Sequence, residues 1–181
     1  MPLFRRGQPP EALSAAITGV KLGDRVLFAG TDDVRLVTGL ATRAGLSGRV
    51  VLIAPDDRAA RARAERVEQG GGLVEPLAGA LNALSLDDGG FDVAVTEETL
   101  MALDDQHRHE AIAALFRALR PGGRLLWIER HARGGLFSKP APDTASREQS
   151  LAAAGFRGVR TLAAAEGRTY VEGIKAAATG N

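Results

Sequence analysis

The chain has 181 residues, 45% hydrophobic and 25% charged, which is enough to bury the core of one domain. Its 23 Lys and Arg residues nearly balance 22 Asp and Glu residues, so no overall positive field attracts nucleic acid or an anionic membrane. The lack of cysteine excludes disulfides and cysteine nucleophiles, and we expect no metal centre. Residues 1–10 show no secretory pattern and no later stretch is apolar enough to span a membrane, so we expect a cytoplasmic protein.

Strand and helix patterns alternate along most of the chain. An amphipathic helix is predicted at residues 10–18 and an apolar strand at residues 25–29. Further strands are predicted at residues 49–53, 73–77, 91–96 and 124–128. The helices between them are expected at residues 33–44, 56–69 and 104–119, and each has an Asp near its first turn that can cap free N–H groups.

The last part of the chain has a different pattern. After a loop rich in Pro, Ser and Gly at residues 134–142, a helix is predicted at residues 144–154, followed by strands at 158–163 and 169–175. The short turn between these two strands requires an antiparallel pair. Apolar strands separated by helices favour a parallel sheet covered on both faces. The sequence therefore predicts a Rossmann-like α/β three-layer sandwich, with a mainly parallel seven-stranded sheet and a C-terminal antiparallel hairpin. We expect one domain over residues 1–181, with residues 1–9 flexible.

Three segments carry a resemblance to a known family. They are VKLGDRVLFAG at residues 20–30, FDVAVTEETL at residues 91–100 and LFRALRPGGRLLWIE at residues 115–129. Together with the order of elements, they resemble the class I S-adenosylmethionine (SAM)-dependent methyltransferases, in particular the small-molecule enzymes of the ubiquinone-biosynthesis type. The resemblance covers residues 10–175, and it implies SAM as the cofactor and a small molecule as the methyl acceptor.

The first-strand signature of that family is an acid followed by alternating glycines, and most of it is replaced here. Phe28 stands at the acid position, Gly30 keeps the first glycine, and Asp32 and Val34 replace the other two. In the family, these glycines let the backbone approach the methionine part of SAM and leave helix N–H groups free for its carboxylate. Asp32 and Asp33 are expected to put negative charge there; alternatively, they are ordinary helix caps.

The other cofactor positions of the family are also altered. The ribose-binding acid falls on Ala54, and Asp56, two residues later, could reach a ribose or cap the next helix. The adenine-binding acid falls on Ala80, beside Leu81, and Thr96 and Glu97 follow the fourth strand. The resemblance thus implies a cofactor site made of a set of residues from four loops: Gly30, Thr31, Asp32, Asp56, Leu81, Thr96 and Glu97.

No catalytic residue is evident, and His131, which follows the fifth strand at the ligand-binding edge of such sheets, is the one candidate. The loop from His131 to Pro142 is the expected lid. His107 and His109 are expected to be solvated, and Trp127 to lie in the core. The acids gathered at this edge predict an acidic mouth, unless most of them cap helices. The helix predicted at residues 56–69 carries arginines at positions 58, 61, 63 and 66. We interpret them as a solvated face with local ion pairs.

Two hypotheses for function stay open. The first is an active SAM-dependent methyltransferase that acts on a small molecule, with substrate positioning supplying much of the acceleration. The second is a noncatalytic methyltransferase-fold domain that binds a ligand or a protein partner, for example as one half of a homodimer. The altered cofactor positions motivate this hypothesis. Nicotinamide or flavin binding is ranked last, because residues 30–35 lack the glycines of a dinucleotide-binding turn.

Overall fold

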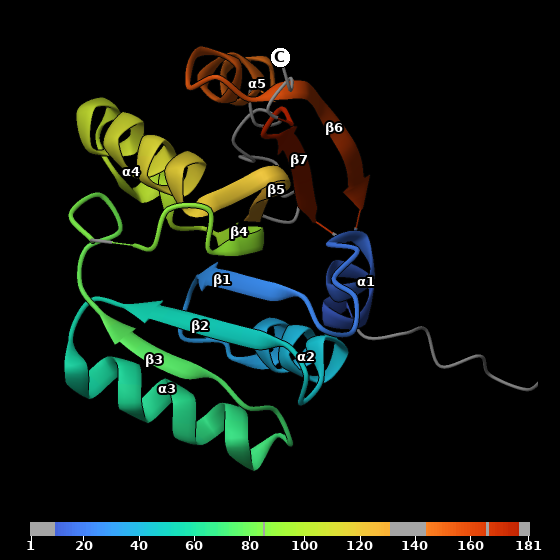
Figure 1. Ribbon diagram of the computed structural model, residues 1–181, viewed down its shortest axis with the longest axis vertical. Helices are drawn as coiled ribbons and strands as arrows, with labels where there is room; N and C mark the ends of the chain where they lie inside the picture. The colour runs from blue at the N-terminus through green and yellow to red at the C-terminus, as the bar shows by residue number, and fades with distance from the viewer. Residues whose placement is uncertain (1–9, 85, 131–143, 166, 178–181) are drawn as a thin grey trace, which may run out of the picture.

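Seven apolar segments of this chain form one continuous sheet. The computed structural model describes residues 10–84, 86–130, 144–165 and 167–177. Across the sheet the strand order is β3-β2-β1-β4-β5-β7-β6 (Figure 1). The strands are β1 Arg25–Ala29, β2 Arg49–Ala54, β3 Glu75–Ala78, β4 Phe91–Glu97, β5 Leu119–Arg130, β6 Arg157–Ala165 and β7 Arg168–Ile174. Strands β1 to β5 run parallel, whereas β7 is antiparallel to both β5 and β6.

Five α-helices and one 3-10 helix are present among the described residues, and the α-helices cover both faces of the sheet (Figure 1). They are α1 Pro10–Ile17, α2 Arg35–Ala44, α3 Asp57–Gln69, α4 Asp105–Ala118 and α5 Thr144–Ala153, with the 3-10 helix η1 at Leu100–Ala102. One buried cluster joins the sheet to α1, α2 and α3 through residues such as Ala15, Leu40 and Val67. A second joins the other face to α4 and α5, through Leu115 and Leu151. The predicted three-layer Rossmann-like sandwich with its C-terminal hairpin is confirmed.

The boundaries of most elements differ from the prediction by one or two residues, and those of the third and fifth strands are the most informative. The third strand begins at Glu75 rather than at residue 73, and Leu73 is exposed. The fifth strand begins at Leu119, because the Pro-Gly-Gly turn lies inside β5 as an irregularity. There the Gly122 N–H donates to the Lys175 carbonyl at 2.8 Å, which holds the end of β7 against β5. No helix in the described part of the chain is long and apolar enough to cross a membrane.

Candidate functional site at the carboxyl edge of the sheet

The carboxyl ends of β1 and β4 lie side by side, because their parallel register pairs Ala29 with Thr96. The loop that follows β1 carries Gly30, Thr31 and Asp32, and β4 ends with Glu97. Five of the seven predicted cofactor residues are thus brought to one edge of the sheet. Ligands of open α/β sheets bind at this edge, where the strand order reverses.

The packing of the Phe28 side chain requires a glycine at position 30. A Cβ atom at this position would lie 2.6 Å from Cε1 of the Phe28 ring, closer than real Cβ contacts come. Phe28 is fully buried, so its ring has little room to move. Phe28, which replaces the family's acid, therefore explains why the residue two positions later is a glycine, without any ligand.

Arg63 of α3 reaches across to the loop after β1. Its Nη1 donates to the Gly30 carbonyl at 2.9 Å, and its Nε donates to Oδ1 of Asp32, also at 2.9 Å. The Arg63 side chain is 10% exposed, whereas that of Asp32 is 80% exposed. The interpretation of Arg63 as part of a solvated face is therefore wrong: it lies on the same helix face as Ala60 and Val67, which are both buried.

Asp33 is held by two arginines. Its Oδ1 accepts hydrogen bonds from both the backbone N–H and Nε of Arg35, at 3.1 and 2.9 Å, so it satisfies the first N–H of α2. Its Oδ2 lies 3.5 Å from Nη2 of Arg130, the last residue of β5. The hydrogen bonds from Arg35 lower the pKa of Asp33 from 3.8 to about 2, against the opposing effect of burial. A helix terminus that the family leaves free for a carboxylate is thus occupied by the chain's own carboxylate.

Glu97 is fully buried between two arginines. Its Oε1 accepts from Nη2 of Arg130 at 3.2 Å and from Nη2 of Arg168 at 3.4 Å. Burial raises the pKa of the Glu97 carboxyl above its ordinary value, although Arg130 and Arg168 oppose this. Oε2 of Glu97 and Oγ1 of Thr96 are buried without a hydrogen-bond partner among the described residues. Each of these atoms is a buried acceptor that is costly without a partner, and a hydrogen-bond donor beside either one would satisfy it.

The two remaining predicted cofactor residues have structural roles. Asp56 caps α3, because its Oδ1 accepts from the Ala59 N–H at 2.8 Å, as the helix-cap interpretation predicted. Leu81 is 5% exposed and packs into the buried cluster under α4. The candidate base His131 and the expected lid lie outside the described residues.

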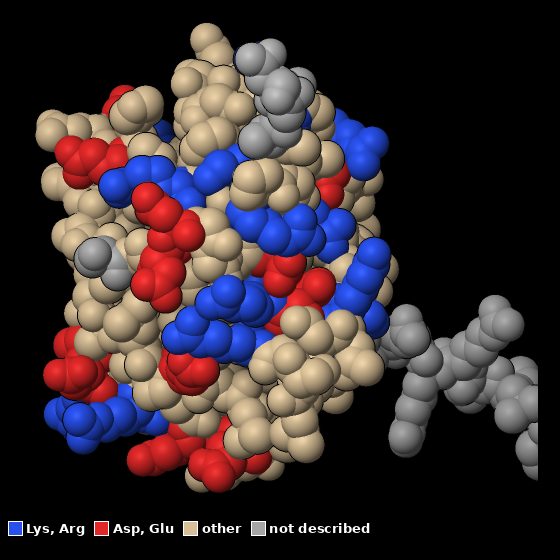
Figure 2. Space-filling view, viewed as in Figure 1, with Lys and Arg blue, Asp and Glu red and all other residues tan. Residues whose placement is uncertain are grey.

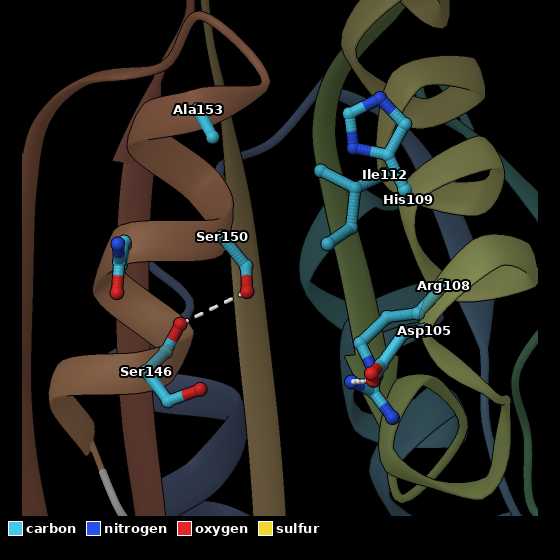
Figure 3. A pocket seen from close by; sticks show the side chains of 8 residues that line it. Asp105, Arg108, His109, Ile112, Ser146, Ser150 and Ala153 are labelled. Carbon is cyan, nitrogen blue, oxygen red and sulfur yellow. Dashed lines mark hydrogen bonds and ion pairs between the residues drawn. The ribbon is translucent and has the colours of Figure 1, made fainter.

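Two hollows lie on the α4 and α5 side of the sheet. One, of about 300 Å³, is lined by η1, α4, the end of β5 and α5. It contains Glu129, which is 7% exposed and accepts from Nε1 of Trp127 at 2.7 Å. Burial raises the pKa of the Glu129 carboxyl. The second, of about 330 Å³, lies between α4 and α5, where His109 and Ile112 of α4 lie across the gap from Ser150 and Ala153 of α5 (Figure 3). Among the described residues, no group of three His, Asp or Glu side chains is placed to hold a metal ion.

The acids that follow β1 and β4 do not form an acidic mouth, because arginines pair with them, and Asp56 caps α3 as the alternative interpretation expected. Arg130 alone contacts Asp33, Glu97 and Glu98, with its Nε 3.3 Å from the Glu98 carboxylate. Figure 2 shows acidic and basic side chains interspersed over this view of the molecule, rather than a large region of one sign. Sequence reasoning missed Arg63 and Arg168. The helical spacing of Ala60, Arg63 and Val67 was the available signal for Arg63.

The strands that form this edge lie in a segment that matches a known protein family. Residues 26–123, from β1 to the start of β5, match the family described as "Methyltransferase domain". The chain belongs to this methyltransferase family. Solved relatives share its fold: a SAM-dependent methyltransferase from Aquifex aeolicus superposes with a TM-score of 0.78 at 22% identity, covering 92% of this chain and 89% of that one. The structure titled "PigF with SAH" has a TM-score of 0.67 at 19% identity, covering 84% of this chain and 50% of PigF.

Curated relatives are similar over a shorter part of their length. The ubiquinone/menaquinone biosynthesis C-methyltransferase UbiE of Cronobacter sakazakii is 34% identical over 127 residues, which are 68% of this chain and 46% of that protein. UbiE of Pseudomonas putida is 33% identical over 135 residues, 72% of this chain and 48% of that protein. The chain therefore spans about half the length of the curated relatives it matches. The resemblance to the ubiquinone-biosynthesis type is confirmed, and these comparisons support SAM as the cofactor.

The residues at the carboxyl edge do not fit the amino-acid end of SAM in the arrangement that the structure shows. The Gly30 carbonyl and the Asp32 carboxylate are bonded to Arg63, and the first N–H of α2 is bonded to Asp33. Arg130 bridges the same loop to the end of β4. These bonds occupy groups of the loop to which the amino-acid end of SAM would otherwise be able to bind.

Proposed function

We propose that this chain is a single methyltransferase domain, spanning residues 1–181, that uses SAM to methylate a small molecule at the carboxyl edge of its sheet. The observation that carries the proposal is the family match over residues 26–123, the segment that builds β1 to β4 and their connections. The relatives' name, ubiquinone/menaquinone biosynthesis C-methyltransferase, supports a small organic acceptor. The unsatisfied buried oxygens of Thr96 and Glu97 lie at that edge and suit a ligand that donates hydrogen bonds.

Calorimetric titration with SAM and with S-adenosylhomocysteine tests the proposal. We expect saturable binding of both ligands, and affinity at micromolar strength would establish that the altered signature still serves the cofactor. No heat at millimolar ligand, from a protein shown to be folded by circular dichroism, would refute SAM use by this chain.

We propose a noncatalytic methyltransferase-fold domain as the second candidate, because one specific observation favours it. Two backbone groups that the family leaves open for the methionine part of SAM are here bonded to side chains of the same chain, namely those of Arg63 and Asp33. The same titration separates the two candidates. Binding of a partner protein or of another small molecule, without SAM binding, would favour the noncatalytic domain.

A further inference from the structure

We propose that Arg63 and Arg130 compete internally with the amino-acid end of SAM, and so set the affinity of this chain for its cofactor. This inference rests on the proposed function, because it concerns the same edge of the sheet and the same ligand. It goes beyond that function by naming two residues outside the family signature as the determinants of cofactor affinity.

The first competitor is Arg63, whose guanidinium donates a hydrogen bond to the Gly30 carbonyl in the loop after β1. Its guanidinium is largely buried and makes bonds to Gly30 and Asp32 within 3 Å. A guanidinium is a cation with several N–H donors, and the ammonium group at the amino-acid end of SAM offers the same chemistry. Both therefore compete for the same acceptors at this loop.

The second competitor is Arg130, which joins the loop after β1 to the end of β4. It contacts Asp33 on the β1 side, and Glu97 and Glu98 on the β4 side. Glu97 is fully buried whereas the Arg130 side chain is 36% exposed, so their pair is partly desolvated and is screened less than a surface pair. Asp33 in turn occupies the first N–H of α2. Asp33, which Arg35 and Arg130 both contact, therefore keeps this N–H from an anionic ligand while it stays in place.

We call the form in which Arg63 and Arg130 have left their partners the open form. A ligand that binds only this form has an apparent dissociation constant that is raised by the inverse of the fraction of molecules in it. Removing both arginines should therefore strengthen binding of S-adenosylhomocysteine by about tenfold or more. The amino-acid end is the part that Arg63 and Arg130 oppose. The affinity for 5′-methylthioadenosine, which has the nucleoside and the thioether but no amino-acid end, should therefore change by less than about twofold.

The experiment is a calorimetric titration of both ligands into the wild type and three variants: Arg63→Met, Arg130→Met, and the double variant. Methionine keeps an unbranched apolar stem while it removes the charge. Arg49→Met is the matched control, since Arg49 pairs with Glu75 at the opposite, amino end of the sheet, with Nη2 2.7 Å from the carboxylate. We expect a gain in affinity for S-adenosylhomocysteine but not for 5′-methylthioadenosine. We expect this gain in the Arg63 and Arg130 variants but not in Arg49→Met.

The titrations can overturn the inference in several ways. Weaker binding in the variants would mean that the arginines hold the ligand, and equal binding would mean that they are bystanders. Micromolar binding by the wild type without any gain in the variants would refute internal competition and still support the proposed function. If the double variant does not fold, Arg63→Met decides, because its carboxylate partner Asp32 is 80% exposed and tolerates the loss. Absence of gain in that folded variant would also overturn the inference.

Discussion

Replacing Gly30 with alanine tests whether this glycine serves internal packing. The new Cβ would lie 2.6 Å from Cε1 of the Phe28 ring, and the ring is fully buried. Overpacking of this kind costs about 1–3 kcal/mol. For a domain of this size, that cost corresponds to a fall of roughly 2–10 °C in the melting temperature. The smaller side chain in Phe28→Leu should create room, so Gly30→Ala should cost much less in that background.

The assay is urea unfolding of four proteins, namely the wild type, both single variants and the double variant, which together form a double-mutant cycle. We expect a coupling free energy between the two positions of about 1 kcal/mol or more, because their atoms are in direct contact. A cost for Gly30→Ala below about 0.5 kcal/mol, or the same cost in both backgrounds, would refute the packing explanation. In that case the glycine would have to be explained by the approach of a ligand.

Three further changes have expected outcomes. Asp56→Ala should lower the unfolding free energy by about 0.5–2 kcal/mol through loss of the α3 cap, seen in urea unfolding, with unchanged S-adenosylhomocysteine affinity; a large loss of affinity would instead make Asp56 a ribose ligand. The lowered pKa of Asp33, about 2, means that its stabilising contact with Arg35 is complete above about pH 4 and is lost as the pH falls toward 2. Asp33→Asn should therefore cost about 1–2 kcal/mol at pH 7, after allowance for solvent screening, and should flatten acid unfolding between pH 4 and 2; an unchanged acid limb would contradict this. Trp127→Phe should cost about 1–3 kcal/mol in urea unfolding, because buried Glu129 loses a donor at 2.7 Å, and a cost near zero would show that water replaces it.

Local patterns were sufficient to predict the layers of this fold. The apolar runs at residues 25–29 and 49–53 gave β1 and nearly all of β2, because strands buried on both faces leave a continuous hydrophobic signal. The short turn before residue 169 was sufficient to predict the antiparallel β6–β7 pair. The start of β3 was misplaced, because Leu73 is apolar but exposed, and the short 3-10 helix η1 carries no periodic signal.

The candidate site was harder to predict, because its contacts join residues that are far apart along the chain. Arg63 and Asp32 are separated by 31 positions, and Arg130 and Asp33 by 97. Counting acids near the sheet edge predicted negative charge there, since such a count includes only the residues of the edge loops. The neutralising guanidinium of Arg63 enters from within α3, and that of Arg168 from the start of β7. Charge at a site therefore depends on tertiary packing, which local sequence patterns do not determine.

The replacements at this edge are connected to one another rather than independent losses. Phe28 fills the space that makes a glycine necessary at position 30, and Asp32 gives Arg63 the carboxylate that holds it over the Gly30 carbonyl. Restoring a single family residue would therefore leave the other contacts in place. Asp32→Gly alone, for example, removes one acceptor of Arg63 but leaves its bond to the Gly30 carbonyl. Because several linked side chains occupy this loop, the proposed internal competition predicts that the affinity for the cofactor depends on Arg63 and Arg130 more than on any one glycine.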